Sequence, residues 1–91
     1  MRFKNLFSPI KIRDLTLKNR IVMPAMGTKF ANEDRTVSKQ LIDYHVARAE
    51  GGCALNIVEV ASVHGPSAPR HFVAVYDDLF IPGLKELTDA I

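Results

Sequence analysis

The spacing of apolar and polar residues changes along the chain, and each change indicates a different element of secondary structure. Residues 6–17 alternate between the two kinds in two short runs, which predicts a β-hairpin with turns at residues 8–9 and 13–14. Residues 21–23 form a short, continuous apolar run, which is typical of a strand buried on both faces. Residues 27–37 are polar and lack a period, so we expect a loop there.

A helix is predicted after this loop, because apolar residues recur on one face at helical spacing. Ser38 is the expected N-cap. Gly51 and Gly52 are expected to end the helix, since glycine accepts the left-handed conformation of a C-cap. His45 lies on the apolar face, so we expect it to pack rather than to act in catalysis. The residues of this face are Leu41, Ile42, His45, Val46 and Ala49.

The second half of the chain repeats the order of strand and helix. A strand is expected over residues 53–60, followed by a loop over residues 64–70 that holds two prolines and a glycine. Pro82 suits the first turn of another helix. Strand, helix, strand, helix is the order of a parallel α/β unit, so we expect an α/β fold. The buried face of the last helix would carry Leu84, Leu87 and Ile91.

The strand predicted at residues 21–23 ends at small residues and a methionine, with no long charged side chain until Lys29. Such a strand end leaves backbone amides and carbonyls uncovered, and a flat polar ring can dock against them. In parallel barrels the chemistry lies at the carboxyl ends of the strands. Residues 24–27 are therefore a candidate binding segment.

The composition excludes several classes of protein. Hydrophobic residues make up 47% and charged residues 24%, as in ordinary soluble domains, and the net charge of +2 is too small to indicate a nucleic-acid partner. No apolar run approaches the roughly 18 residues of a membrane span, and the amino terminus lacks the apolar core of a secretory signal. Cys53 is the single cysteine, which excludes an internal disulfide and a cysteine-cluster metal site. We expect a cytoplasmic protein without nucleic-acid or membrane partners.

Several segments together resemble a known family. Residues 6–12, LFSPIKI, and residues 15–23, LTLKNRIVM, resemble the amino terminus of the old yellow enzyme family of FMN-dependent NAD(P)H:flavin oxidoreductases and ene reductases. Further similar segments follow in order at residues 41–44, 48–52 and 81–84. The resemblance is nearest to the branch of 2,4-dienoyl-CoA reductases and bile-acid-type enoate reductases. It implies the amino-terminal portion, about a quarter, of a (β/α)8 TIM barrel, preceded by a β-hairpin.

The length of the chain agrees with a partial barrel. A complete barrel needs roughly 250 residues, so we expect residues 1–91 to be the amino-terminal fragment of a flavin-binding TIM-barrel domain rather than a short natural protein. A quarter barrel leaves strand edges and one sheet face without partners. We therefore expect the isolated chain to self-associate, to be partly disordered or to aggregate.

The resemblance also implies that residues 24–27 contact the flavin ring. In the family the corresponding positions wrap the ring with backbone groups and with the methionine, here Met26, and a backbone amide can donate near flavin N5. Many members place proline directly before this methionine, whereas this chain has Ala25 there and Pro24 one position earlier. Gly27 completes the segment. The alternative is that these residues form a generic end of a barrel strand.

Thr28 and Val60 are the other candidate contacts with the cofactor. The resemblance implies that the Thr28 hydroxyl bonds the flavin or tunes its potential; alternatively, nearby backbone satisfies it. In the family a small residue near Val60 approaches the flavin through its backbone, and the alternative is ordinary packing at a strand end. Glu59 is expected at the mouth of the barrel, where its charge is solvated or paired.

Other polar residues lie outside the candidate cofactor contacts. Asn19 and Arg20 precede the first strand, at the end opposite the flavin, so we expect Asn19 to close a turn and Arg20 to pair with a carboxylate. His64 and His71 lie at or beside the loop after the second strand, where they could meet a substrate. Cys53 is expected to be an inert apolar residue. We assign no catalytic residue and no metal ligand within the chain.

The resemblance implies the activity of a whole enzyme. NADH or NADPH would give a hydride to FMN, and the reduced flavin would deliver it to an activated alkene or an enoyl-CoA-type substrate. The catalytic acid, the phosphate grip and the cysteines of an iron–sulfur cluster, if the enzyme has one, would lie beyond Ile91. The chain alone would then be inactive. Two alternatives stay open: a self-associating barrel fragment with a structural role only, and a different phosphate-binding TIM-barrel enzyme.

Overall fold

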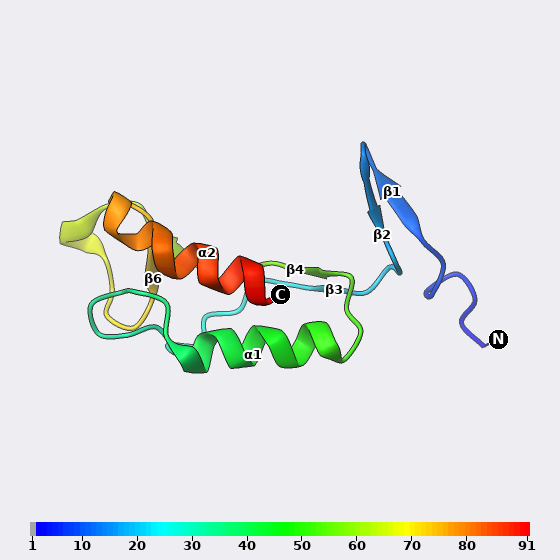
Figure 1. The fold of residues 1–91 in the computed structure, drawn as a ribbon, viewed down its shortest axis with the longest axis horizontal. Coiled ribbons are helices and arrows are strands. Elements are labelled where there is room, and N and C mark those ends of the chain that lie inside the picture. The colour runs from blue at the N-terminus through cyan, green and yellow to red at the C-terminus, as the bar shows by residue number, and fades with distance from the viewer. Residues whose placement is uncertain (1) are drawn as a thin grey trace.

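The computed structural model describes residues 2–91 and shows a mixed α/β fold. Figure 1 shows the two α-helices lying alongside each other, while the first pair of strands stands apart near the amino terminus. The shape is elongated, with extents of 49 × 26 × 21 Å. The elements in chain order are β1 (Ile10–Ile12), β2 (Leu15–Leu17), β3 (Val22–Met23), α1 (Lys39–Glu50), β4 (Leu55–Asn56), β5 (Ala61–Ser62), η1 (Gly65–Ser67), β6 (Val73–Ala74), η2 (Asp78–Phe80) and α2 (Ile81–Ala90).

The antiparallel pair at the amino terminus is shorter than the hairpin expected over residues 6–17. β1 pairs with β2 so that Ile10 lies opposite Leu17, and Arg13 makes the tight turn between them with a left-handed φ of 51°. Residues 2–7 form turns instead of strand. The backbone amide of Phe7 donates to the carbonyl of Phe3 within these turns, which takes up groups that a longer strand would use.

The other strands pair in parallel. β3 pairs with β4, with Val22 opposite Leu55, and α1 provides the crossover between them. Two further backbone bonds extend this pair, because Ala54 donates to Ile21 at 2.9 Å and Ile57 donates to Met23 at 3.0 Å. The expected parallel α/β unit is therefore present.

The strand expected over residues 53–60 is not continuous. The structure has strand only at β4 and again at β5, which pairs in parallel with β6. Pairing with β3 stops where Pro24 follows it, because proline has no backbone N–H to donate. β6 was not expected from the sequence, since it is only two residues long and is recognisable mainly by its partner and its complete burial.

Both helices begin where the sequence predicts. The Ser38 side chain accepts a hydrogen bond from the Leu41 amide at 3.0 Å, and Gly52 follows the end of α1 with a left-handed φ of 113°. Pro82 lies in the first turn of α2. The expectation that Ile91 belongs to the buried face of this helix is wrong: Ile91 is 45% exposed, because α2 ends at Ala90.

The core lies where the two helices meet the loop that follows β3. Leu41 and His45 of α1 and Leu87 of α2 are each at most 1% exposed. The described chain leaves the other side of β3 and β4 uncovered, since Val22 is 43% exposed and Ile57 is 46% exposed. One cluster consists of Ala31, Leu41 and Val73, with Phe30, Val37 and Leu84 packed against it.

Neither helix of the described residues has the length and apolar character needed to cross a membrane.

The cap of α1 yields a test of local stability. We expect Ser38→Ala to lower the free energy of unfolding by about 1 kcal/mol, because the Leu41 amide loses its side-chain acceptor. The measurement is urea unfolding followed by circular dichroism. Ser62→Ala, at a serine whose hydroxyl has no hydrogen-bond partner among the described residues, is the matched control. Equal stability of the two variants would contradict the capping role.

Candidate functional site

The carboxyl ends of β3 and β4 lie at the same edge, because the two strands are parallel. Residues 24–28 follow β3 there, and residues 57–60 follow β4. The segments that the sequence proposed as separate candidates are thus neighbours in the structure. This edge is the candidate functional site.

Residues 24–27 are all exposed at this edge. Met26 is 58% exposed, so its side chain is available to a ligand. Within the described chain, the backbone amides of residues 25–27 donate to no other group. Exposed amides of this kind can donate to an acceptor on a bound molecule.

Another segment of the chain approaches Gly27 so closely that a larger residue would not fit there. A Cβ on Gly27 would lie 2.9 Å from Cε1 of Phe72, nearer than carbon atoms can pack. The Phe72 ring therefore packs directly on the candidate segment. The sequence reasoning missed Phe72, because no local pattern marks an aromatic residue that packs on a distant glycine.

Thr28 is bonded on two sides. Its hydroxyl donates to Oε1 of Glu59 at 2.6 Å and accepts from the Phe30 amide at 3.1 Å. The backbone bond is the alternative that the sequence left open for this hydroxyl. One lone pair of the hydroxyl remains, so both expectations for Thr28 can hold together.

Glu59 was expected to be solvated or paired, and the structure shows it buried and hydrogen-bonded. It is 3% exposed, and its charge is met by the Thr28 hydroxyl. The other oxygen, Oε2, has no partner among the described residues. A buried carboxylate of this kind is costly unless it is hydrogen-bonded, which makes its one bond important. Val60, the next residue, is 58% exposed at the edge of the site.

His45 lies on the covered side, as its place on the apolar face of α1 predicts. It is 1% exposed, and neither ring nitrogen has a partner in the described chain. Burial lowers the pKa of His45 below its usual 6.5; the negative charge of Glu59 opposes this shift and the positive charge of Arg48 adds to it. His45 is therefore neutral at pH 7.

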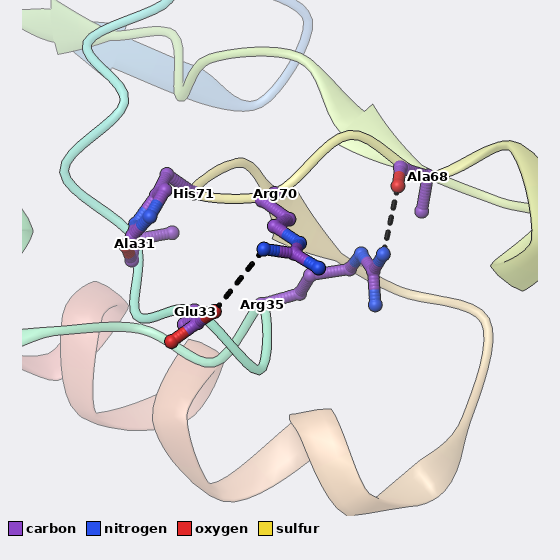
Figure 2. Close-up of polar contacts among 6 residues, drawn as sticks. All are labelled: Ala31, Glu33, Arg35, Ala68, Arg70 and His71. Carbon is purple, nitrogen blue, oxygen red and sulfur yellow. Dashed lines mark hydrogen bonds and ion pairs between the residues drawn. The ribbon is translucent and has the colours of Figure 1, made fainter.

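Two loops at this end of the strands are tied together, as Figure 2 shows. Arg35 Nη2 donates to the Ala68 carbonyl at 2.8 Å, and Arg70 pairs with Glu33 at 3.4 Å. Both loops also contain left-handed backbone, at Arg35 with φ 71° and at His71 with φ 63°. The loop after β3 and the loop before β6 therefore form one connected wall.

The histidines of this wall have local partners. Nδ1 of His71 lies 3.1 Å from the Ala31 carbonyl, which can only accept, so the proton of this bond is on Nδ1; Figure 2 shows the two residues side by side. Nδ1 of His64 lies 3.0 Å from Oγ of Ser67. Contact of either histidine with a substrate stays a prediction.

Asn19 and Arg20 have structural roles at the opposite end. Asn19 is 8% exposed; it donates to the Gly52 carbonyl at 2.7 Å and accepts from the Ile21 amide at 2.9 Å. Arg20 was expected to pair with a carboxylate, but among the described residues its Nε donates to the Ser8 hydroxyl at 3.2 Å instead. Within residues 2–91, no three metal-ligating side chains come together.

The chain matches the NADH:flavin oxidoreductase / NADH oxidase family over residues 5–91. It is 46% identical over 91 residues to the NADH oxidase of Thermoanaerobacter brockii, a match that covers 98% of this chain and 14% of that protein. It is 36% identical over 88 residues to an NADPH dehydrogenase of Listeria monocytogenes serotype 4b, which covers 94% of this chain and 26% of that protein. The chain thus spans a small part of the length of these relatives.

Solved structures give the same result. The fold superimposes on a 2-naphthoyl-CoA reductase in complex with 2-naphthoyl-CoA with a TM-score of 0.90 at 30% identity, covering 96% of this chain and 14% of that one. It superimposes on the old yellow enzyme from Trypanosoma cruzi with a TM-score of 0.85 at 28% identity, covering 99% of this chain and 24% of that one. The chain belongs to the NADH:flavin oxidoreductase family of old yellow enzymes. This membership removes the alternative of a different phosphate-binding barrel enzyme.

The contact between Gly27 and Phe72 can be tested directly. We expect Gly27→Ala to destabilise the protein by about 1–3 kcal/mol, because the new methyl group overlaps the ring. Phe72→Ala in the same chain should relieve this overlap, so the two changes should not add. Urea unfolding provides the measurement. Gly65→Ala is the control, since its Cβ would meet Tyr76 at an ordinary 3.4 Å.

Burial of His45 predicts a dependence of stability on pH. The folded state holds this ring neutral, whereas the unfolded chain takes up a proton near pH 6.5, so the unfolded state binds more protons below that value. The free energy of unfolding should therefore fall as the pH drops from about 7 to about 5. His45→Leu should reduce this slope, and His64→Leu, at an exposed histidine, should keep it. Identical slopes in both variants would show that His45 is not the cause.

Proposed function

We propose that the chain is the amino-terminal part of an FMN-dependent NAD(P)H oxidoreductase, and that residues 24–28 form one side of its flavin site. The observation that carries this proposal is the exposed strand end at which the amides of residues 25–27 donate to no group of the described chain. Membership of a flavin oxidoreductase family supports FMN as the molecule that they contact.

The residues present fit a flat polar ring. The small side chain of Ala25 leaves room for close approach to the backbone, and Met26 supplies an exposed, polarizable surface. Val60, on the neighbouring segment, would approach the same ring from the side. The Phe72 ring fills the space that a side chain at residue 27 would take.

Bound FMN would accept a hydride from NAD(P)H and pass it to an activated alkene or an enoyl-CoA-type substrate. A relative solved with 2-naphthoyl-CoA and NADH- and NADPH-using relatives support this class of reaction. The part of this chain is to orient the flavin and to exclude water from one side of it. We place the catalytic acid, the phosphate grip and any iron–sulfur cluster outside these residues.

The uncovered side of β3 and β4 supports a partial barrel. Val22, Ile57 and Val60 are each more than 40% exposed, and apolar side chains of barrel strands normally face a filled interior. We propose that these residues face the interior of a TIM barrel, of which this chain forms about the first quarter. Without the remaining strands, the same surface would cause the isolated chain to self-associate and to be inactive. A cytoplasmic location also stays a proposal.

The role of Met26 can be tested in the full-length protein. We expect that protein to contain FMN, and we expect Met26→Ala to raise the dissociation constant of FMN about tenfold, because burial of a methionine is worth at least about 1.4 kcal/mol. Quenching of flavin fluorescence on titration into the flavin-free protein gives the constant. The matched control is Val63→Ala, at a residue that is 79% exposed outside the segment.

A full-length protein that binds no FMN would refute the proposed function. Equal dissociation constants in the wild type and in both variants would refute the contact with Met26 while leaving the function intact.

A further inference from the structure

We propose that Glu59 is a positioning residue: it takes the hydroxyl proton of Thr28, so that this hydroxyl can only accept a hydrogen bond from a flavin bound at residues 24–28. The inference rests on the proposed function, because it specifies what one residue of that site offers to the ligand. It assigns a role to the buried carboxylate that binding by residues 24–27 alone does not use.

The direction of the bond follows from its chemistry. The carboxylate of Glu59 is acceptor-only, so the Thr28 hydroxyl must be the donor across the 2.6 Å that separates the two oxygens. Glu59 is 3% exposed, and no other group of the described chain bonds to Oε2. A charged acceptor in such a place makes a short and strong bond, and water does not compete for the proton.

This bond uses the single proton of the Thr28 hydroxyl. A hydroxyl has one proton and two lone pairs, and the Phe30 amide occupies one of those lone pairs at 3.1 Å. The remaining lone pair can accept from an N–H of a ligand. As long as the bond to Glu59 lasts, Thr28 cannot donate to a carbonyl or to an unprotonated ring nitrogen.

The same bond also anchors the loop. Beyond Thr28, the carbonyl of Phe30 accepts a hydrogen bond from the Ser38 hydroxyl, which in turn accepts from the Leu41 amide at the start of α1. A continuous series of hydrogen bonds therefore connects Glu59, in the segment that follows β4, to the first turn of α1. Glu59 is the buried end of this series.

The covered side offers no competing donor in the described chain. Among the described residues, His45 is the other buried titratable side chain. Neither of its ring nitrogens is hydrogen-bonded to Glu59 or to any other described residue. Buried polar atoms without partners are rare in folded proteins, so their presence behind a binding segment calls for a functional reason. Orientation of Thr28 supplies a reason for the burial of Glu59 through Oε1, while Oε2 has no partner in the described chain.

The experiment uses the full-length protein with Glu59→Gln, Glu59→Ala, Thr28→Val and the double variant Glu59→Ala/Thr28→Val. The first measurement is the dissociation constant of FMN by fluorescence quenching. The second is the rate of hydrogen exchange at the Phe30 amide in the flavin-free protein. This rate reports whether the hydrogen bond between Phe30 and Thr28 is intact when no cofactor is bound. Glu50→Ala and Glu50→Gln, at the exposed end of α1, are the matched controls.

The expected result is a coupled effect. Glu59→Ala and Thr28→Val should each weaken FMN binding about tenfold, and the double variant should be no weaker than either, because both changes remove the same interaction. Glu59→Gln should stay within about twofold of the wild type, since its amide oxygen still accepts from Thr28. The Phe30 amide should exchange faster in Glu59→Ala and in Thr28→Val, and the Glu50 controls should match the wild type.

Additive effects of the two changes, or wild-type affinity in Glu59→Ala, would overturn the positioning role. Loss of binding in Glu59→Gln equal to that in Glu59→Ala would do the same. If Glu59→Ala does not fold, Glu59→Met, whose apolar side chain of similar length offers no oxygen acceptor to Thr28, takes its place with the same expected weakening. A wild-type protein that binds no FMN overturns the proposed function and this inference together, whereas a wild type that binds FMN with unaffected variants overturns the inference alone.

Discussion

The parallel pairing of β3 with β4 is the interaction on which the candidate site depends. Parallel strands require a crossover, and α1 provides it while covering one side of the pair. Because both strands run in the same direction, the segments that follow them leave from the same edge. Pro24 ends the pairing there, since it has no N–H, and the amides that come after it are left without partners in the described chain.

The site has two sides of opposite character. The outer side is open and largely apolar, with Met26 and Val60 each 58% exposed. The inner side contains buried polar groups, among them Glu59 and His45, whose burial is costly. Hydrogen bonding between Glu59 and Thr28 offsets part of this cost, so the segment is held from behind by a directional bond, and the outer side stays free for a ligand.

The wall formed by the two loops depends mainly on backbone acceptors. Arg35 donates to the carbonyls of Ala68 and Pro69, and His71 is bonded to the carbonyl of Ala31. Such bonds do not depend on the side chains of the accepting residues. The exposed ion pair between Arg70 and Glu33 contributes little by comparison, because water and salt screen it.

The order of elements from β1 to β4, the start of each helix and the end of α1 were determined by the sequence itself. The cap at Ser38, the left-handed Gly52 and the early Pro82 act within one turn of helix, so residues a few positions apart are enough to predict them. Segments 6–12 and 15–23, together with the shorter ones at 41–44, 48–52 and 81–84, likewise indicated the family, which the match over residues 5–91 confirms.

Only the tertiary structure decided what surrounds the candidate segment. The sequence left open whether Glu59 is solvated or paired, missed β6 and did not connect Phe72 with Gly27. Glu59 bonds to a residue 31 positions away, and the pairing that defines β6 and the contact that confines Gly27 also join segments far apart in the chain. Local periodicity carries no information about such pairs. They form because the packing of the helices brings distant segments into contact, and the neighbouring residues in the sequence do not determine that packing.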